Sequence, residues 1–248
     1  MEKSRHQIRL NPAAIVRKLS AAAILLIIAS IGVQFSKFIL GHGSLKGLVQ
    51  LLYLDGEKNI PTYFSVMLLV FSSLILAGIS VLKWNRREPY LFHWALLSFG
   101  FLFMSYDEAF QVHEKLSFPL EHAGLGFFHF SWVIIGIGLV LVLGFLFLPF
   151  VLHLSSKFRT LFLLAAFLYL SGAIGMEMIG GWYVANHGNG FGYSMIVVLE
   201  EGFEMFGIIF FLWSLLKYCA EKFPYIGIMF SHHQQEISPG ISTAPHQS

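Results

Sequence analysis

Long apolar stretches alternate with short polar segments along the chain, and this pattern predicts repeated membrane crossings. Each stretch is close to the ~20 residues that a helix needs to cross the hydrocarbon core of a bilayer. We expect helices because a helix satisfies its own backbone hydrogen bonds where water is absent. Six stretches qualify, and we place the spans at residues of about 19–40, 62–83, 89–116, 127–152, 160–184 and 194–218.

Composition supports the same fold class. Hydrophobic residues make up 56% of the 248 residues and charged residues only 12%, whereas a soluble domain carries roughly a quarter charged residues. The prediction is an all-α, polytopic integral membrane protein with a six-helix transmembrane bundle over 19–218. Residues 1–18 form a predicted cytoplasmic N-terminal segment. The polar stretch 219–248 is a predicted cytoplasmic, disordered tail.

The distribution of Lys and Arg predicts the orientation. Cytoplasmic loops carry an excess of these residues. If the N-terminus is cytoplasmic, 12 of the 16 fall on the cytoplasmic side, and only Lys37, Lys46, Lys58 and Lys115 fall on the other. We therefore expect both termini in the cytoplasm. The host membrane is the plasma membrane or an internal one, which composition does not distinguish.

Local signals add detail at the predicted helix ends. Pro89 suits the first turn of a helix, where its missing N–H costs nothing, and Ser194 is a candidate N-cap for the sixth span. The outer connection 41–61 is longer than a hairpin needs. Its apolar positions between Leu45 and Leu54 predict a short helix lying along the membrane interface.

Charge and cysteine content exclude some classes of function. The net charge of +2 and the lack of a basic stripe argue against nucleic-acid binding. A single cysteine, Cys219, excludes an intrachain disulfide and a metal site built from cysteines.

Acidic residues inside three of the predicted spans are the strongest functional signal. A carboxylate within a span costs about 2.5–3.5 kcal/mol on insertion scales, so such residues usually serve a function. The third span carries Asp107, Glu108, His113 and Glu114, the fifth carries Glu177, and the sixth carries Glu200, Glu201 and Glu204.

These acids also share a depth. Asp107 lies 18 residues from Pro89, Glu177 lies 17 from Thr160, and Glu200 lies 17 from Lys217. With a rise of 1.5 Å per residue, each sits about 26 Å from the cytoplasmic boundary, in the outer leaflet. Glu204 lies one turn deeper. Three spans therefore bring carboxylates to one level.

The side-chain directions expected for regular helices separate His113 from the acidic stripe of the third span. In a regular helix, Asp107, Gln111 and Glu114 share one stripe, and His113 points roughly 120° away from Asp107. Ala173, Gly180 and Gly181 give the fifth span a small-residue face, which favours close helix approach.

No predicted span contains a Lys or Arg deep enough to neutralise these acids, so either some are protonated or cations bind them. A carboxylate-rich site favours Mg, Ca, Mn or Fe, and one or two imidazoles would favour Fe, Mn or Zn. The cofactor predicted is a divalent metal ion. Its predicted ligands are Asp107, Glu177, Glu200 and Glu204, with Glu108, Glu201, His113, Glu114 and His129 as weaker candidates.

Three functions remain open on the sequence. The first is a metal-dependent intramembrane hydrolase or oxidoreductase acting on a lipid or lipophilic substrate near the outer leaflet, with Asp107 and Glu108 as candidate catalytic residues. The sequence does not contain the usual motifs of such enzymes: it has no His-Glu-x-x-His motif, no paired Glu-x-x-His motif and no multi-histidine box.

The second function is a cation- or proton-coupled transporter. Residues 107–111 resemble residues 200–204, as an inverted repeat would, but the two segments lie at different distances from the starts of their helices. The third is an accessory subunit of a membrane complex. The lipid bilayer is the one partner common to all three.

Overall fold

The computed structural model describes residues 11–56, 58–117 and 129–224. Within them the chain is all-helical, without a strand. The elements are α1 (Pro12–Phe38), η1 (Leu45–Gly47), α2 (Leu48–Leu52), α3 (Ile60–Arg86), α4 (Leu91–Phe110), α5 (Val112–Ser117), α6 (Trp132–His153), α7 (Ser156–Leu170), η4 (Ser171–Met176), α8 (Glu177–His187) and α9 (Phe191–Lys222).

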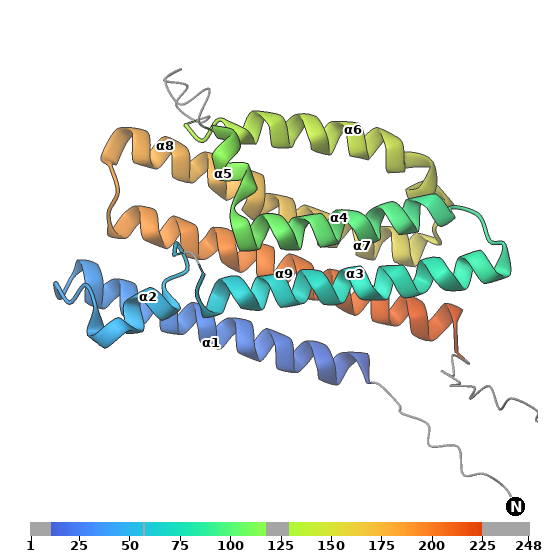
Figure 1. Ribbon diagram of the computed structural model, residues 1–248, viewed down its shortest axis with the longest axis horizontal. Helices are drawn as coiled ribbons and strands as arrows, with labels where there is room; N and C mark the ends of the chain where they lie inside the picture. Colours follow the sequence, from blue (N-terminus) through green and yellow to red (C-terminus); the bar gives the residue numbers. More distant parts are fainter. Residues whose placement is uncertain (1–10, 57, 118–128, 225–248) are drawn as a thin grey trace, which may run out of the picture.

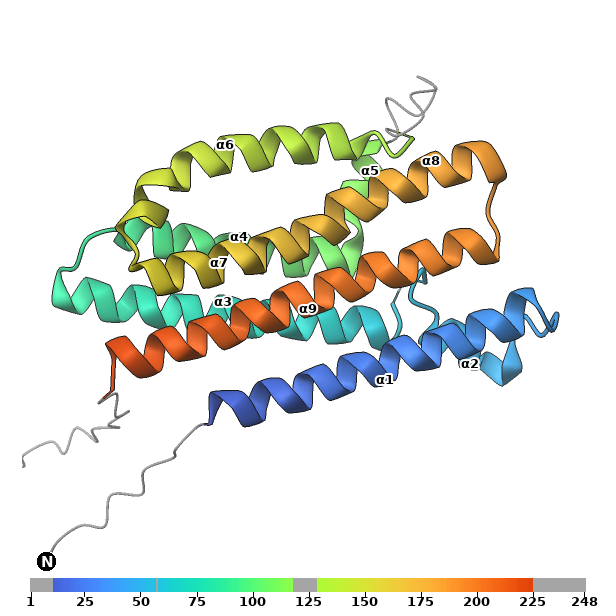
Figure 2. The ribbon, with the colours of Figure 1, turned by 180° about the vertical axis from the view of Figure 1, so that it is seen from behind.

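The long helices run side by side along one axis (Figures 1 and 2), and α7, η4 and α8 form one continuous rod. Helix α9 is the central element, because it packs against α1, α3, α7, η4 and α8. Helix α6 packs against η4 and α5. The first residue of α1 and the last of α9 lie at the same end of the molecule, which we call the terminal end.

Four helices of the described residues are long and apolar enough to cross a membrane: α1, α3, α6 and the rod Ser156–His187. This is consistent with the predicted multi-pass membrane protein. Helices α4 and α9, which coincide with the third and sixth predicted spans, are not among the four, and both carry carboxylates within their length.

The helix ends correct two details of the sequence prediction. Helix α4 begins at Leu91, after Tyr90 at the N-cap, so Pro89 lies just outside it. Helix α9 begins at Phe191 with Gly190 at the N-cap, so Ser194 is buried inside the helix and does not cap it. The short helix predicted in the outer connection is present as α2. Most of the predicted N-terminal segment and tail lies outside the described residues.

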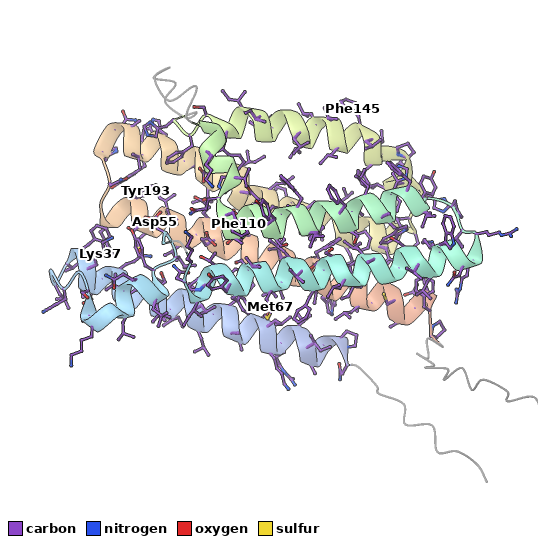
Figure 3. All side chains as sticks on the ribbon, viewed as in Figure 1. Lys37, Asp55, Met67, Phe110, Phe145 and Tyr193 are labelled. Carbon is purple, nitrogen blue, oxygen red and sulfur yellow. The ribbon has the colours of Figure 1, made fainter. Side chains whose placement is uncertain are left out.

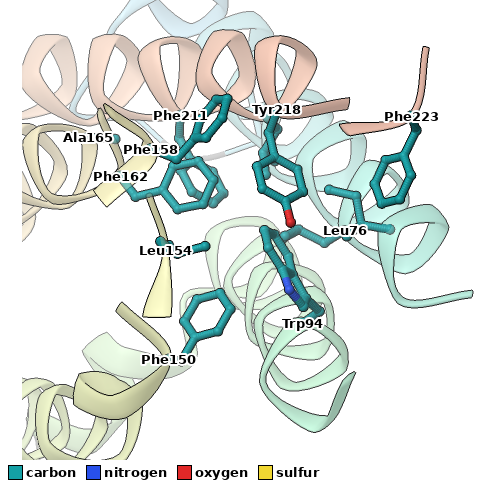
Figure 4. Close-up of a cluster of buried hydrophobic side chains, with 12 residues drawn as sticks. Leu76, Trp94, Phe150, Leu154, Phe158, Phe162, Ala165, Phe211, Tyr218 and Phe223 are labelled. Atoms are coloured by element: carbon teal, nitrogen blue, oxygen red, sulfur yellow. The ribbon is translucent and has the colours of Figure 1, made fainter. Parts of the chain in front are cut away.

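The half of the molecule toward the terminal end is filled by an aromatic core (Figure 4). Its rings and branched side chains come from α3, α4, α6, α7 and α9, and include Trp94, Phe150, Phe158, Phe162 and Tyr218. The Trp94 and Tyr218 ring centroids lie 4.9 Å apart. In a membrane, helix association depends on such close packing. Lipid tails are as apolar as the side chains, so burying the side chains away from lipid does not by itself drive association.

One pair of serines adds polar contacts between α3 and α4. Ser73 donates its hydroxyl to the carbonyl of Ser98 at 2.8 Å, and Ser98 donates back to the carbonyl of Ser73 at 2.9 Å. Small hydroxyl residues let two helices approach closely, and their hydrogen bonds satisfy the hydroxyl and carbonyl groups where water is scarce. The pair therefore fixes α3 against α4, the helix that carries Asp107.

Candidate functional site

A cavity of about 390 Å³ lies at the end of the bundle opposite the terminal end. It forms at the level where α3 begins and α4 ends, while α8 and the start of α9 continue past it (Figure 1). The loop between α2 and α3 reaches the cavity, which is lined by Asp55 of this loop and by Tyr193 of α9, both labelled in Figure 3. The lining thus combines the ends of several helices with a loop.

Seven carboxylates line the cavity, and none of its described lining residues is Lys or Arg. The predicted metal ligands Asp107, Glu177, Glu200 and Glu204 are all among the lining residues, as the depth count predicted. The remaining polar and acidic lining residues are Asp55, Glu108, Glu201, Gln111, His113, Thr62, Tyr169 and Tyr193.

Two weaker candidates, Glu114 and His129, are not among the described lining residues. The side chain of Glu114 lies outside the part of the chain that the structure describes. His129 is exposed and its neighbour Phe130 lines the cavity instead. The His129 Cβ packs 3.2 Å from where a Cβ on Gly181 would lie, so the predicted small-residue face of the fifth span contacts this segment.

A π-helical turn, η4, immediately precedes Glu177. Such a turn adds a residue to the helix repeat, changes the direction of the following side chains and is frequent at functional sites. Gly172 in this turn lies so close to α9 that a Cβ there would be 2.6 Å from the carbonyl oxygen of Glu200 and 2.8 Å from Cγ of Glu204. The turn and the glycine therefore bring Glu177 against the acids of α9, a contact that sequence reasoning missed.

A second glycine contact lies one turn away. A Cβ on Gly207 of α9 would be 2.6 Å from the backbone nitrogen of Tyr169. The close approach places the Tyr169 side chain beside Glu204. Tyr169 lines the cavity, yet the sequence singled out neither residue, because an aromatic residue in an apolar helix usually faces lipid or the core.

The third predicted span is broken at Gln111, and the break corrects the predicted stripe of Asp107, Gln111 and Glu114. Gln111 has a left-handed backbone (φ 51°, ψ 54°) and separates α4 from α5. The turn brings His113 back to Asp107, which accepts from the His113 backbone N–H at 2.8 Å and contacts its Nδ1 at 2.7 Å. The 120° separation expected for a regular helix therefore does not apply, because the helix is broken between the two residues.

Trp132, at the start of α6, connects to the acids of α8 and α9. Its indole N–H donates to Oε1 of Glu177 at 3.1 Å. Glu177 in turn lies beside Glu200, so the two carboxyl groups interact directly. The Trp132 ring also lies against the imidazole of His113, with centroids 4.7 Å apart. Trp132 is a second lining residue that the sequence did not indicate.

The loop before α3 holds the seventh carboxylate, Asp55. The Tyr53 hydroxyl donates to Oδ2 of Asp55 at 2.7 Å and lies 3.1 Å from the Ser194 hydroxyl oxygen. Lys37 lies over the Tyr53 ring, 4.1 Å from its centroid. Burial raises the pKa of Asp55 above its usual value, against the Tyr53 hydrogen bond and the Lys37 charge, which lower it. Burial also raises the pKa of the Tyr53 hydroxyl.

Asn59 fixes this loop to the start of α3. Its side-chain oxygen accepts from the Thr62 N–H at 3.0 Å, which caps the helix. Its amide donates to the carbonyls of Tyr53 at 2.6 Å and Gly56 at 2.7 Å. The sequence Asp55-Gly56 next to a helix cap was the available signal for Asp55, but a loop position of this kind is usually solvated.

The carboxylates are distributed around the cavity. Among the described residues, no group of three or more His, Cys, Asp or Glu side chains is arranged so that it could hold a metal ion. Within the cavity, Asp107 pairs with His113, and Glu177 lies beside Glu200.

Residues 18–218 match a domain of unknown function (DUF8692), and the chain belongs to this family. Neither a curated protein nor a solved structure matches the chain.

Proposed function

We propose that this member of the DUF8692 family is a membrane enzyme that binds a cation in its acidic cavity and acts on a lipid or lipophilic substrate there. In this proposal α4 and α9 join the four apolar helices as spans, which makes six. Both termini are cytoplasmic, as the Lys and Arg bias suggests. The cavity then faces the outer leaflet.

The observation that carries the proposal is the composition of the cavity. Seven carboxylates from α4, α8, α9 and the α2–α3 loop line one space of about 390 Å³, without a Lys or Arg among its described lining residues. Carboxylates in a membrane are costly unless they are neutralised. A bound cation neutralises several at once, and a cavity of this volume also admits part of a substrate.

The proposed resident cation is a divalent metal ion held by Asp107, Glu177, Glu200 and Glu204. Oxygen donors of this kind suit Mg, Ca, Mn or Fe. Because these side chains are spread around the cavity, binding requires glutamate side chains to change rotamer. A metal ion in such a site would polarise a substrate oxygen or activate water.

The groups that move protons in this proposal are Asp107 and His113, together with Glu108. A carboxylate bonded to one ring nitrogen orients an imidazole and stabilises its protonated form. The Asp107–His113 contact at 2.7 Å has this arrangement. Glu108 lines the same cavity one residue further along α4.

An enzyme is favoured because the bundle is densely packed on the terminal side of the cavity. The half of the molecule toward the terminal end is filled by the aromatic core of Trp94, Phe150, Phe162 and Tyr218. A catalytic pocket needs access from one side only, whereas a carrier must open to both sides in turn.

Metal binding tests the proposal directly. Wild-type protein in detergent is titrated with Mn²⁺ and free Mn²⁺ is followed by EPR, alongside Glu177→Gln, Glu204→Gln and the control Glu221→Gln, whose exposed side chain pairs with Lys157 at the terminal end. We expect both site variants to lose at least about tenfold in affinity and the control to match wild type. Failure of the wild type to bind Mn²⁺, or equal binding by all four proteins, overturns the metal site.

A second candidate function is a cation- or proton-coupled carrier. It is favoured by the closeness of Glu177 and Glu200, since two neighbouring carboxyl groups can bind one proton between them. Proton or cation flux into liposomes, lost in Glu177→Gln, would support the carrier. An altered lipid profile in cells expressing the wild type but not Glu177→Gln, without such flux, would support the enzyme.

A further inference from the structure

Among the lining residues, Trp132 contacts a member of each of two pairs of polar side chains, Asp107 with His113 and Glu177 with Glu200. Its indole N–H donates to Glu177 at 3.1 Å, and its ring lies against His113 with the planes at 54°. Glu177 lies beside Glu200 on α9, and His113 bonds to Asp107 on α4. One side chain on α6 therefore links groups from α4–α5 with groups from α8 and α9.

The local sequence of α6 makes room for this indole. Gly136 lies one turn after Trp132, and a Cβ there would be 3.0 Å from Cζ3 of the indole ring. A larger residue at 136 would push the ring away from its place along the helix. Gly136 therefore has a physical role in holding Trp132 toward the cavity.

Helix α6 otherwise makes little contact with the bundle. Only 11% of the most apolar stretch of α6 is buried, against 28% of the corresponding stretch of α1 and 44% of that of α3. Much of its length, including Phe145 at 78% exposed (Figure 3), faces outward. A side chain that only filled space would not need a polar contact here, whereas Trp132 directs its one polar atom to a carboxylate.

We propose that Trp132 is the positioning residue of the site, which holds the Asp107–His113 pair and the Glu177–Glu200 pair facing the same cavity. This role rests on the proposed function. An indole suits it because the N–H orients a carboxylate as a neutral donor. A Lys or Arg at the same place would neutralise Glu177 and compete with a bound cation.

Tryptophan fluorescence tests the contacts without reference to any activity. The chain has five tryptophans, so the spectrum of each protein minus that of its Trp132→Phe counterpart isolates Trp132. We expect the Trp132 component to change in intensity or wavelength in His113→Gln and in Glu177→Gln, and to stay constant in the control Glu221→Gln. An unchanged component in both site variants overturns the linking role.

Mn²⁺ affinity tests the consequence for the site. Groups that orient metal ligands typically affect affinity by about 10–100-fold, and we expect a loss in this range for Trp132→Phe. Trp84→Phe, at the far end of α3, is the matched control. Trp132→His, which retains a ring N–H, should recover part of the affinity. Trp132→Phe and Glu177→Gln together should lose less than the two single losses combined, because they remove one interaction.

The outcomes separate this inference from the proposed function. If the wild type binds no Mn²⁺, the proposed function fails, and the fluorescence comparison still decides whether Trp132 links the two pairs. If the wild type binds Mn²⁺ and Trp132→Phe, with wild-type thermal stability, binds it equally well, the positioning role is wrong and the metal site stands.

Discussion

A Cβ atom placed on Gly172 would lie 2.6 Å from the carbonyl oxygen of Glu200. The backbone of η4 thus lies against the backbone of α9 at the turn that carries the cavity acids. Because the contact is with backbone, neither partner can move away without separating the two helices. The position of Glu177 relative to Glu200 depends on this contact.

Gly172→Ala should therefore lower the stability of the protein. Overpacking of this kind typically costs about 1–3 kcal/mol. The matched control is Gly175→Ala in the same turn, where the nearest atom to a Cβ is the Leu170 carbonyl oxygen at 4.0 Å, an ordinary contact. Thermal unfolding in detergent compares the two, and equal melting temperatures would show that η4 does not depend on the contact.

Gly207→Ala should destabilise the protein by a similar amount for an independent reason. Its Cβ would lie 2.6 Å from the backbone nitrogen and 2.8 Å from the Cα of Tyr169. Gly202→Ala on the same helix is the control, since its Cβ meets only the Ile27 side chain at 3.5 Å. Thermal unfolding should rank Gly207→Ala well below Gly202→Ala. The reverse order would contradict the close approach of α7 and α9.

Asn59→Ala should cost more than the loss of an ordinary helix cap. An N-cap is worth about 1 kcal/mol, and Asn59 also donates to two loop carbonyls while only 2% exposed. We expect a loss of about 2 kcal/mol in total. Asn11→Ala, which removes the exposed cap of α1, should cost about 1 kcal/mol or less.

Hydrogen exchange gives the local readout for this loop. In Asn59→Ala the amides of residues 53–56 should exchange faster, because the side chain that holds their carbonyls is gone. In Asn11→Ala they should exchange as in the wild type. Unchanged exchange in both variants would mean that Asn59 does not hold the segment carrying Asp55.

Glu88→Gln should lower stability at neutral pH and lose this effect in acid. Lys83, with only 8% of its side chain exposed, donates to Glu88 at 2.7 Å, and this bond lowers the pKa of Glu88 below its ordinary 4.5. A lowered carboxyl pKa stabilises the fold above the ordinary value, and the contribution is lost as pH falls through the lowered value. We expect a difference of about 1 kcal/mol, since Glu88 is partly exposed.

Melting temperatures of both proteins between pH 7 and pH 3.5 check this expectation. The gap should be constant near neutral pH, begin to narrow near the ordinary Glu value of 4.5 and close as the pH falls through the lowered value. A gap that persists unchanged in acid would show that Glu88 acts through packing and not through its charge.

The apolar pattern along the chain determined the helical class and the approximate helix positions, because lipid-facing helices must be apolar over their whole length. The predicted span 62–83 lies inside α3 at Ile60–Arg86, and 194–218 lies inside α9 at Phe191–Lys222. The ends were less accurate, as at Ser194, where Gly190 is the actual cap. Caps depend on short-range geometry that several neighbouring residues can satisfy.

The sequence alone also indicated six of the seven acids that line the cavity, though not Asp55, since a constant rise per residue converts position along a helix into depth. It did not determine how they are held. The left-handed Gln111 that returns His113 to Asp107, the π-helical turn before Glu177, and the approach of Trp132 and Asp55 from other segments all depend on tertiary contacts. A glutamine has no local preference for a left-handed backbone, and the Asp107–His113 bonds made across the break stabilise it there.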